Sequence, residues 1–268
     1  TLKIYFSNFK LRFVSSLQYR AAALAGIPTQ IFFGLVYIMV YLAFYESNDS
    51  SVPMNFAQLA SYLWLNQIFF SLINMWYRDQ EIFNLIKNGN ISYELCRPVD
   101  IYNMWYSKVI STRLASVCLR AIPVTIVAFL LPDPIGLSLP ASLPSFLLFL
   151  VTLIIGTLLM TSIITLYHVL TLFTMNEVGV TNIFMAISDI LSGLVIPIVF
   201  FPPFLQTISN FLPFKYISDF PFRIYAGNIP INEVLTGIIV QVIWVIILIV
   251  IGKLLMKYIS KRMTVQGG

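Results

Sequence analysis

Charge is what this sequence has least of. Residues 134–176 contain no Asp, Glu, Lys or Arg, and only 10% of the 268 residues are charged, against about a quarter in an ordinary soluble domain. Hydrophobic residues make up 59% of the chain. A bilayer core about 30 Å thick is crossed by roughly 20 apolar helical residues, and only a helix or a closed barrel satisfies its own backbone hydrogen bonds there. The composition excludes a soluble domain, and the long uncharged runs predict an all-α membrane protein.

The sequence also lacks the residues of metal and nucleotide chemistry. It has one histidine, His168, and two cysteines, Cys96 and Cys118, which argues against a conventional metal site and a disulfide framework. No G-x-x-x-x-G-K-[ST] phosphate-binding loop occurs, and no Ser, His and acid are recognisably arranged for nucleophilic catalysis. We therefore expect no catalytic residue, no metal and no cofactor bound by this chain. We expect His168 to pack inside the membrane domain.

Nearly uncharged windows recur along the chain, each long enough to cross a bilayer with some tilt. They predict one transmembrane domain over residues 1–268 with six transmembrane helices, at residues 25–45, 56–77, 110–131, 145–173, 178–201 and 233–252.

Lys and Arg decide the orientation, because short loops that carry them stay in the cytoplasm. With the N-terminus inside, only Lys215 and Arg223 of the 16 basic residues fall on the outer side. An even number of spans also places the basic tail inside. The net charge of +5 then reflects membrane orientation and not nucleic-acid binding. We expect a multi-pass protein with both termini in the cytoplasm.

Two segments at the membrane surfaces do not fill the bilayer. Residues 1–20 predict an amphipathic interfacial helix rather than a merely solvated basic start; its apolar face would carry Leu2, Phe6, Phe9, Phe13 and Leu17. Residues 200–230 are aromatic and interrupted by prolines, which suit helix starts and breaks better than one continuous span. We expect an external re-entrant helical hairpin there, between the fifth and sixth helices.

The longest cytoplasmic stretch, residues 78–108, mixes charged with aromatic residues. Residues 79–87 predict a short helix with Asp79 and Glu81 in its first turn and Lys87 in its last, as the helix dipole favours, and Gly89 is a reasonable stop. One face of this helix is apolar and consists of Ile82, Phe83 and Ile86. A helix without a core of its own needs the membrane surface or a partner protein to dock on, unless the segment is only a connector.

Ionisable groups inside the predicted spans are unusual, because each costs roughly 2.5–3.5 kcal/mol on insertion scales unless it is paired or hydrated. Asp189 lies in the middle of the fifth span, on a small and polar stripe that includes Asn182, and Arg120 of the third span comes at about the same depth. Either Arg120 and Asp189 form an ion pair, or Arg120 snorkels to the inner interface while Asp189 lines a wet pathway. The second span adds a milder polar stripe with Gln67 and Asn74.

The order of these parts resembles that of ABC-2 type transporter permeases. The loop from Gly89 to the run Leu95-Cys96-Arg97-Pro98 is similar to that family's Gly and Leu-x-Arg-Pro pattern. Further similar stretches are residues 197–204, 212–214, 220–221, 225–227 and 265–268. The resemblance covers essentially the whole chain.

Apolar, aromatic spans with few fixed charges suit an amphipathic or hydrophobic cargo such as a drug, lipid or peptide, although the same surface could equally face lipid. The family resemblance implies the permease subunit of an ATP-driven exporter in the cytoplasmic membrane of a bacterium. Its partners would be membrane lipid, a second permease, identical or a sister, and separate ABC ATPase subunits, which bind ATP and Mg. The implied ATPase-coupling residues are Asp79, Glu81, Ile82, Phe83, Ile86, Gly89, Arg97, Pro98 and Glu177. The intramembrane polar or path-lining residues would be Gln67, Asn74, Arg120, Asn182 and Asp189.

Two other function classes remain open. An ion-coupled secondary transporter usually needs several intramembrane carboxylates or broken helices at mid-bilayer, and only Asp189 is offered. An intramembrane lipid-modifying enzyme needs a clustered acid, base or nucleophile set. Copurification of an ATPase subunit would favour the permease, whereas ion-driven transport by the chain alone would favour the secondary transporter.

Overall fold

The computed structural model describes residues 2–18, 20–47, 52–76 and 79–261. Within these ranges the regular structure is helical, which confirms the predicted all-α class. Arg78, at the start of the predicted cytoplasmic loop, and the similar stretch at residues 265–268 lie outside the described residues. The helices are α1 (Leu2–Gln18), α2 (Arg20–Ser47), α3 (Phe56–Ile68), α4 (Phe70–Ile73), α5 (Gln80–Lys87), α6 (Ile91–Leu95), α7 (Ile101–Leu130), α8 (Leu143–Thr174), α9 (Glu177–Leu191), α10 (Pro203–Phe211), α11 (Asp219–Tyr225) and α12 (Ile231–Ser260), with 3₁₀ turns η1 (Ile198–Phe200) and η2 (Phe214–Tyr216).

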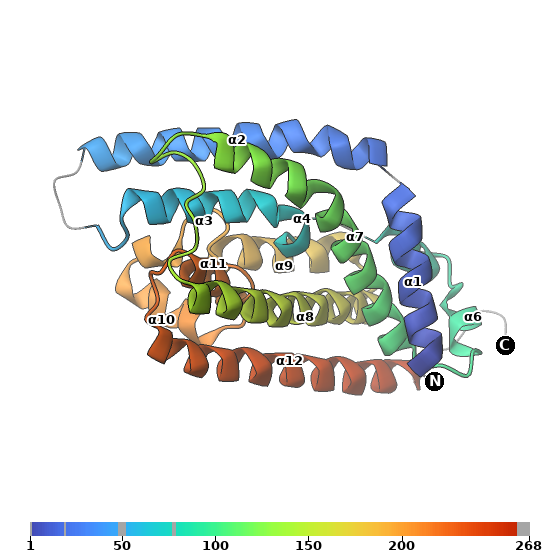
Figure 1. The fold of residues 1–268 in the computed structure, drawn as a ribbon. Helices are drawn as coiled ribbons and strands as arrows, with labels where there is room; N and C mark the ends of the chain where they lie inside the picture. The colour runs from blue at the N-terminus through green and yellow to red at the C-terminus, as the bar shows by residue number, and fades with distance from the viewer. Residues whose placement is uncertain (1, 19, 48–51, 77–78, 262–268) are drawn as a thin grey trace.

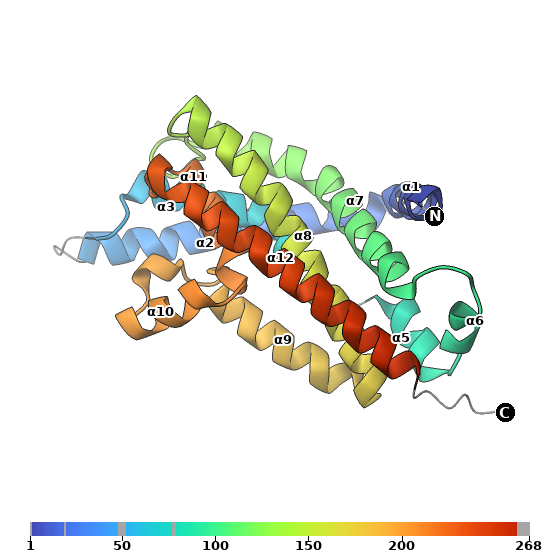
Figure 2. The same cartoon turned by 90° about the horizontal axis from the view of Figure 1, so that it is seen from below.

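Four helices are long and apolar enough to cross a membrane, at Leu24–Ser47, Ile101–Leu130, Leu143–Thr174 and Ile231–Ser260. They correspond to the first, third, fourth and sixth predicted spans. α8 is the central one, flanked by α7, α9, α11 and α12 (Figures 1 and 2). Six hydroxyl side chains of α8 each donate a hydrogen bond to the backbone carbonyl four residues earlier, so their polar groups are paired within the helix. They belong to Thr152, Thr157, Thr161, Ser162, Thr165 and Thr171.

The second and fifth predicted spans are shorter than expected. α3 has 13 residues and α9 has 15, so each extends only about 20 Å at 1.5 Å per residue. The predicted continuous helices at 56–77 and 178–201 are therefore wrong at their C-terminal ends. α3 breaks at Phe69 and its continuation α4 ends at Asn74, while the chain after α9 turns at Gly193 with a φ of +78°.

The turn at Gly193 joins α9 to the segment before α12. A Cβ at Gly193 would lie 2.5 Å from the Tyr62 hydroxyl, so only glycine fits there. That hydroxyl lies 2.7 Å from the carbonyl of Gly193 and 3.2 Å from Oδ1 of the buried Asp219. Ser192 accepts hydrogen bonds through its carbonyl from the N–H of Asp219 and the hydroxyl of Ser218. The end of α9 is thereby fixed to the start of α11.

α1 is the helix predicted for residues 1–20, and it lies beside the lower part of α7 (Figure 1). The Ser107 hydroxyl donates to the carbonyl of Tyr5 at 2.9 Å, and the Tyr5 hydroxyl accepts from the N–H of Asp100 at 3.1 Å. Phe6, on the predicted apolar face, remains 69% exposed. α1 thus packs on the protein through both polar and aromatic side chains, such as Arg12 and Phe9, which are half-buried, while Phe6 and Leu11 remain exposed.

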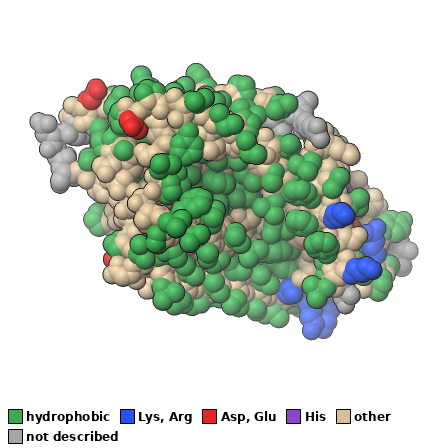
Figure 3. Space-filling model, viewed as in Figure 1, with side chains coloured by type: hydrophobic (Ala, Val, Ile, Leu, Met, Phe, Trp, Pro, Cys, Tyr) green, Lys and Arg blue, Asp and Glu red, His purple; other side chains and the backbone are tan. Residues whose placement is uncertain are grey.

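The two ends of the molecule differ in charge. On the face shown in Figure 3, the Lys and Arg side chains gather at the end that holds α1, and acidic side chains appear at the opposite end. Between the two ends the surface is covered by large apolar side chains, many of them more than half exposed, such as Leu235, Ile239 and Ile246 of α12. This band is far more apolar than the surface of a soluble protein.

Candidate functional site

α5 is an amphipathic helix whose apolar face packs on the protein's own membrane helices. Ile82, Phe83 and Ile86 are buried, and Ile82 and Ile86 share a core with side chains of α7, α8 and α12. The ring of Phe83 stacks on Tyr167 with centroids 6.3 Å apart and meets His168 edge-on at 5.0 Å. The prediction of a helix without its own core is therefore wrong. His168 packs among aromatic rings, in agreement with the role expected from the sequence.

Four charged side chains tie α5 to α1 and α7. Arg12 of α1 donates two hydrogen bonds to Glu81, 2.6 and 2.7 Å long. Lys108 of α7 places its Nζ 2.9 Å from both Glu81 Oε2 and Asp79 Oδ1. Asp79 is also the N-cap of α5, because its side chain accepts from the N–H groups of Glu81 and Ile82. We call Arg12, Asp79, Glu81 and Lys108 the charge cluster.

The charge cluster is buried on one side and open on the other. The side chains of Lys108 and Asp79 are 9% and 8% exposed, whereas that of Glu81 is 51% exposed. Partial burial raises the pKa of Glu81, but the hydrogen bonds and charges of Arg12 and Lys108 outweigh it and lower this pKa to about 2. The hydrogen bond to Glu81 also raises the pKa of Arg12. Glu81 and Arg12 are therefore both ionised at neutral pH.

The predicted coupling residues divide into a supporting layer and an exposed layer. Gly89 ends α5 with a φ of +70° and open space around it, the role predicted for it. Arg97 is exposed and lies 3.8 Å from Glu94, and Tyr93 is 72% exposed. Glu81, Gly89, Arg97 and Pro98 reach the surface, and Asp79, Ile82, Phe83 and Ile86 lie beneath it.

Glu177, the predicted second coupling residue, is the first residue of α9. The chain reverses just before it, where Met175 adopts a φ of 53° and Asn176 accepts from the N–H of Gly179 at 2.9 Å. This turn lies at the same end of the molecule as α5 (Figure 2).

Asn74 is held at the broken end of α4, where it is the C-cap residue. Its side chain donates to the carbonyl of Phe70 at 2.7 Å. Arg113, which is 3% exposed, donates to the carbonyls of Ser71 and Asn74. A cation at a helix C-terminus neutralises carbonyls that have no partner within the helix, so Arg113 stabilises the break in this span.

Asp189 contacts an indole and not Arg120, so the ion pair, one of the two alternatives drawn from the sequence, is not found among the described residues. Its Oδ2 accepts from Trp76 Nε1 at 3.0 Å, and the ion pairs formed within the described ranges do not include one with Arg120. The guanidinium of Arg120 lies against α2, where a Cβ at Gly26 would come within 2.9 Å of its Cζ. Asp189 and Gln67 line one cavity of about 200 Å³ between α2, α3 and α9. Asn182 lies outside that cavity, on the exposed side of α9.

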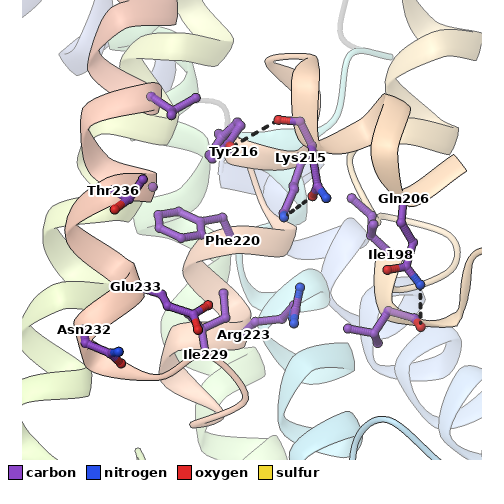
Figure 4. Close-up of a pocket in the computed structure, with 14 residues that line it drawn as sticks. Ile198, Gln206, Lys215, Tyr216, Phe220, Arg223, Ile229, Asn232, Glu233 and Thr236 are labelled. Carbon is purple, nitrogen blue, oxygen red and sulfur yellow. Dashed lines mark hydrogen bonds between the residues drawn. The ribbon is translucent and has the colours of Figure 1, made fainter. Parts of the chain in front are cut away.

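A larger pocket, about 500 Å³, lies between the α10–α11 segment and the start of α12 (Figure 4). Lys215 and Arg223 point into it opposite Glu233, with Phe220 on one wall. Lys215 is hydrogen-bonded to Asn210. This pocket mixes both signs of charge at the end of the molecule opposite the charge cluster.

Sequence reasoning missed several residues of these sites. Lys108 and Arg12 have no local sequence signal that they meet Asp79 and Glu81, because these residues belong to three different helices, α7, α1 and α5 with its N-cap. Gln30 and Trp76 were not among the predicted site residues, although a glutamine inside an uncharged span is a signal of buried hydrogen bonding.

Four long apolar helices, two shorter ones beside them and a strongly apolar surface define a polytopic α-helical membrane protein. Comparison with protein families gives its class of function, because the family described as ABC-2 family transporter protein matches residues 31–267. The chain therefore belongs to the ABC-2 transporter family and is a transport permease, which confirms the resemblance drawn from its sequence motifs. No curated protein matches the sequence.

Proposed function

We propose that this chain is the permease subunit of an ATP-driven exporter, and that it crosses the cytoplasmic membrane six times with both termini inside. The crossings would be α2, α3 with α4, α7, α8, α9 and α12. The segment with α10 and α11 would be a re-entrant hairpin in the outer leaflet. The basic end at α1 supports this orientation, because Lys and Arg favour the cytoplasmic side.

The observation that carries the proposal is the family match together with the way α5 is held. Because the chain belongs to the ABC-2 family and has no phosphate-binding loop in its sequence, separate ABC ATPase subunits with ATP and Mg would supply the energy. α5 presents Asn84 and Lys87 outward while its apolar face is fixed to three long helices. Together with the Glu177 turn, it would form the surface on which an ATPase subunit sits.

A second permease, identical or a sister chain, would complete the transporter, with the path along their interface near α3 and α9. Gln67 and Asp189 support this placement because they already line one cavity. An amphipathic or hydrophobic cargo fits the apolar character of these helices.

Copurification tests the proposal. A tagged chain expressed in its native host should retain a nucleotide-hydrolysing subunit, and Asn84→Arg on the exposed side of α5 should reduce the hydrolysis recovered with it. Asn232→Arg, the same change at an exposed position in the first turn of α12 at the opposite end of the molecule, is the matched control and should leave recovery unchanged. Recovery of no hydrolysing subunit, together with ion-driven transport by the chain alone, would instead identify a secondary transporter.

A further inference from the structure

The cavity between α2, α3 and α9 contains polar groups that have no partner in the described structure. Gln30 of α2 is 4% exposed, and neither its Nε2 nor its Oε1 is hydrogen-bonded. Oδ1 of Asp189 is buried and also lacks a hydrogen bond. A buried polar group left unsatisfied costs about 1–3 kcal/mol. Such groups facing a cavity of about 200 Å³ indicate a place for a polar ligand group.

The charge of the cavity selects the sign of that group. Asp189 has one oxygen bound to Trp76, and in the described residues no Lys or Arg forms an ion pair with it. Its second oxygen therefore offers a full hydrogen-bond acceptor to the cavity, and Gln30 Oε1 offers another. A group that satisfies both must carry several N–H donors and, to balance the carboxylate, a positive charge.

Aromatic rings complete the wall around these acceptors. Phe33, Tyr37, Phe70 and Trp76 line the cavity, and Phe70 meets Trp76 edge-on with centroids 6.0 Å apart. Aromatic faces attract an ammonium group, most strongly where water is excluded. The wall and the acceptors thus favour the same ligand chemistry.

A second hollow continues from the first. It has a volume of about 450 Å³, shares Tyr37 and Val195 with the cavity, and runs along α2 as far as Phe44. Its remaining lining residues are Val40, Tyr41, Ile196 and Phe200, so it is nearly all apolar. A polar chamber joined to an apolar groove has the shape of a head group followed by a hydrocarbon chain.

We propose that this joined site binds a single-chain alkylammonium amphiphile, with its protonated amine between Asp189 and Gln30 and its hydrocarbon chain along α2. This inference rests on the proposed transport function and narrows the cargo to an organic cation. The head lies nearer the basic end of α2 than the chain does, so the amphiphile has the orientation of a molecule resident in the cytoplasmic leaflet.

Equilibrium binding to the full-length chain in lipid nanodiscs tests the proposal, with empty nanodiscs as the blank. Dodecylammonium is expected to bind, dodecyltrimethylammonium to bind more weakly because it has no N–H donor, and dodecanol and dodecyl sulfate to remain at the blank. Asp189→Asn should weaken dodecylammonium binding roughly tenfold to hundredfold, the effect of losing a hydrogen bond to a charged group. Glu233→Gln, the same charge change in the outer pocket, should leave it unchanged.

Gln30→Leu keeps the test decisive if Asp189→Asn does not fold. It should reduce the preference for dodecylammonium over dodecyltrimethylammonium, because one of the two acceptors for its N–H groups is gone while the carboxylate remains. Equal binding of dodecanol, or unchanged binding by both variants, would overturn the proposal. A cross-linking experiment gives a further contradicting outcome. If Val195→Cys in a cysteine-free background cross-links two copies, and the cross-link still forms with saturating dodecylammonium, a second copy of the chain and not the amphiphile occupies the groove. None of these assays uses an ATPase subunit, so copurification can still succeed when amine binding fails.

Discussion

Replacing Lys108 with methionine should destabilise the charge cluster more than any other single change within it. Methionine has a similar length and is apolar, so the main loss is the ammonium group. That group lies 2.9 Å from Asp79 Oδ1 and 2.9 Å from Glu81 Oε2. In Lys108→Met, Asp79 becomes a buried carboxylate with no cation beside it.

The magnitude follows from burial. Breaking a buried ion pair by removing one partner costs about 3–5 kcal/mol, and the side chains of Lys108 and Asp79 are 9% and 8% exposed. Arg12→Gln removes the other cation, but Arg12 and Glu81 are 34% and 51% exposed, and such pairs contribute about 0–1 kcal/mol. Asp79→Asn combined with Lys108→Met should recover most of the loss, because asparagine caps a helix about as well as aspartate and carries no charge.

Thermal unfolding of the detergent-purified protein, followed by size-exclusion fluorescence, measures the order of stability. The expected order is wild type, Arg12→Gln, the Asp79→Asn and Lys108→Met double variant, and then Lys108→Met alone. If Lys108→Met were no less stable than Arg12→Gln, or if the double variant were less stable than Lys108→Met, the buried pair would not be what holds α5.

Three further predictions concern other parts of the chain. Gly193→Ala should destabilise the protein well beyond the roughly 1–2 kcal/mol cost of a left-handed residue, because its Cβ would meet the Tyr62 hydroxyl at 2.5 Å. Gly89→Ala is the control: Gly89 has a similar φ and open space around it, so this variant should cost only the backbone strain. The same unfolding assay measures both. Acid should release α1 from α5, because the pKa of Glu81 is lowered from 4.5 to about 2. The stabilisation by the Arg12–Glu81 pair is complete above about pH 4.5 and is lost as the pH falls toward 2. Faster hydrogen exchange in α1 would reveal the release, and release already at pH 6 would contradict this prediction. Cys96 is free and exposed, so an impermeant maleimide should label it in inside-out vesicles only, with the other cysteine replaced by serine; labelling from outside would reverse the proposed orientation.

Hydropathy located the spans because burial in lipid requires long uncharged helices, but it could not find where two of them end. α4 stops at Asn74 because Arg113, distant in sequence, donates hydrogen bonds to the carbonyls of Ser71 and Asn74. α9 stops near Gly193 because Tyr62 and Asp219 bind the turn that follows it. Both endings depend on contacts between residues far apart in the chain, and a local hydropathy profile does not include such contacts.

The same limit explains the candidate site. The amphipathic spacing of Ile82, Phe83 and Ile86 correctly predicted a helix with one apolar face, yet it could not say whether that face meets a partner or the chain itself. Depth counting placed Arg120 and Asp189 at one level, but level alone does not fix which side of each helix faces the other. Trp76 reached Asp189 because α4 breaks and redirects the chain, which no periodicity would reveal.

How α5 is held bears on how a motor outside the membrane would act on helices within it. A helix docked only by its polar side would slide when pushed, whereas α5 has a buried apolar face in a core shared with α7, α8 and α12. Its N-terminus is held by Asp79 and Lys108, and its first turn is linked through Glu81 to Arg12 of α1. Packed interiors transmit displacement with little compression. A force on the exposed side of α5 would therefore move α7, α8 and α12 together. The bidentate Arg12–Glu81 contact would bring α1, with its exposed Phe6, into the same motion.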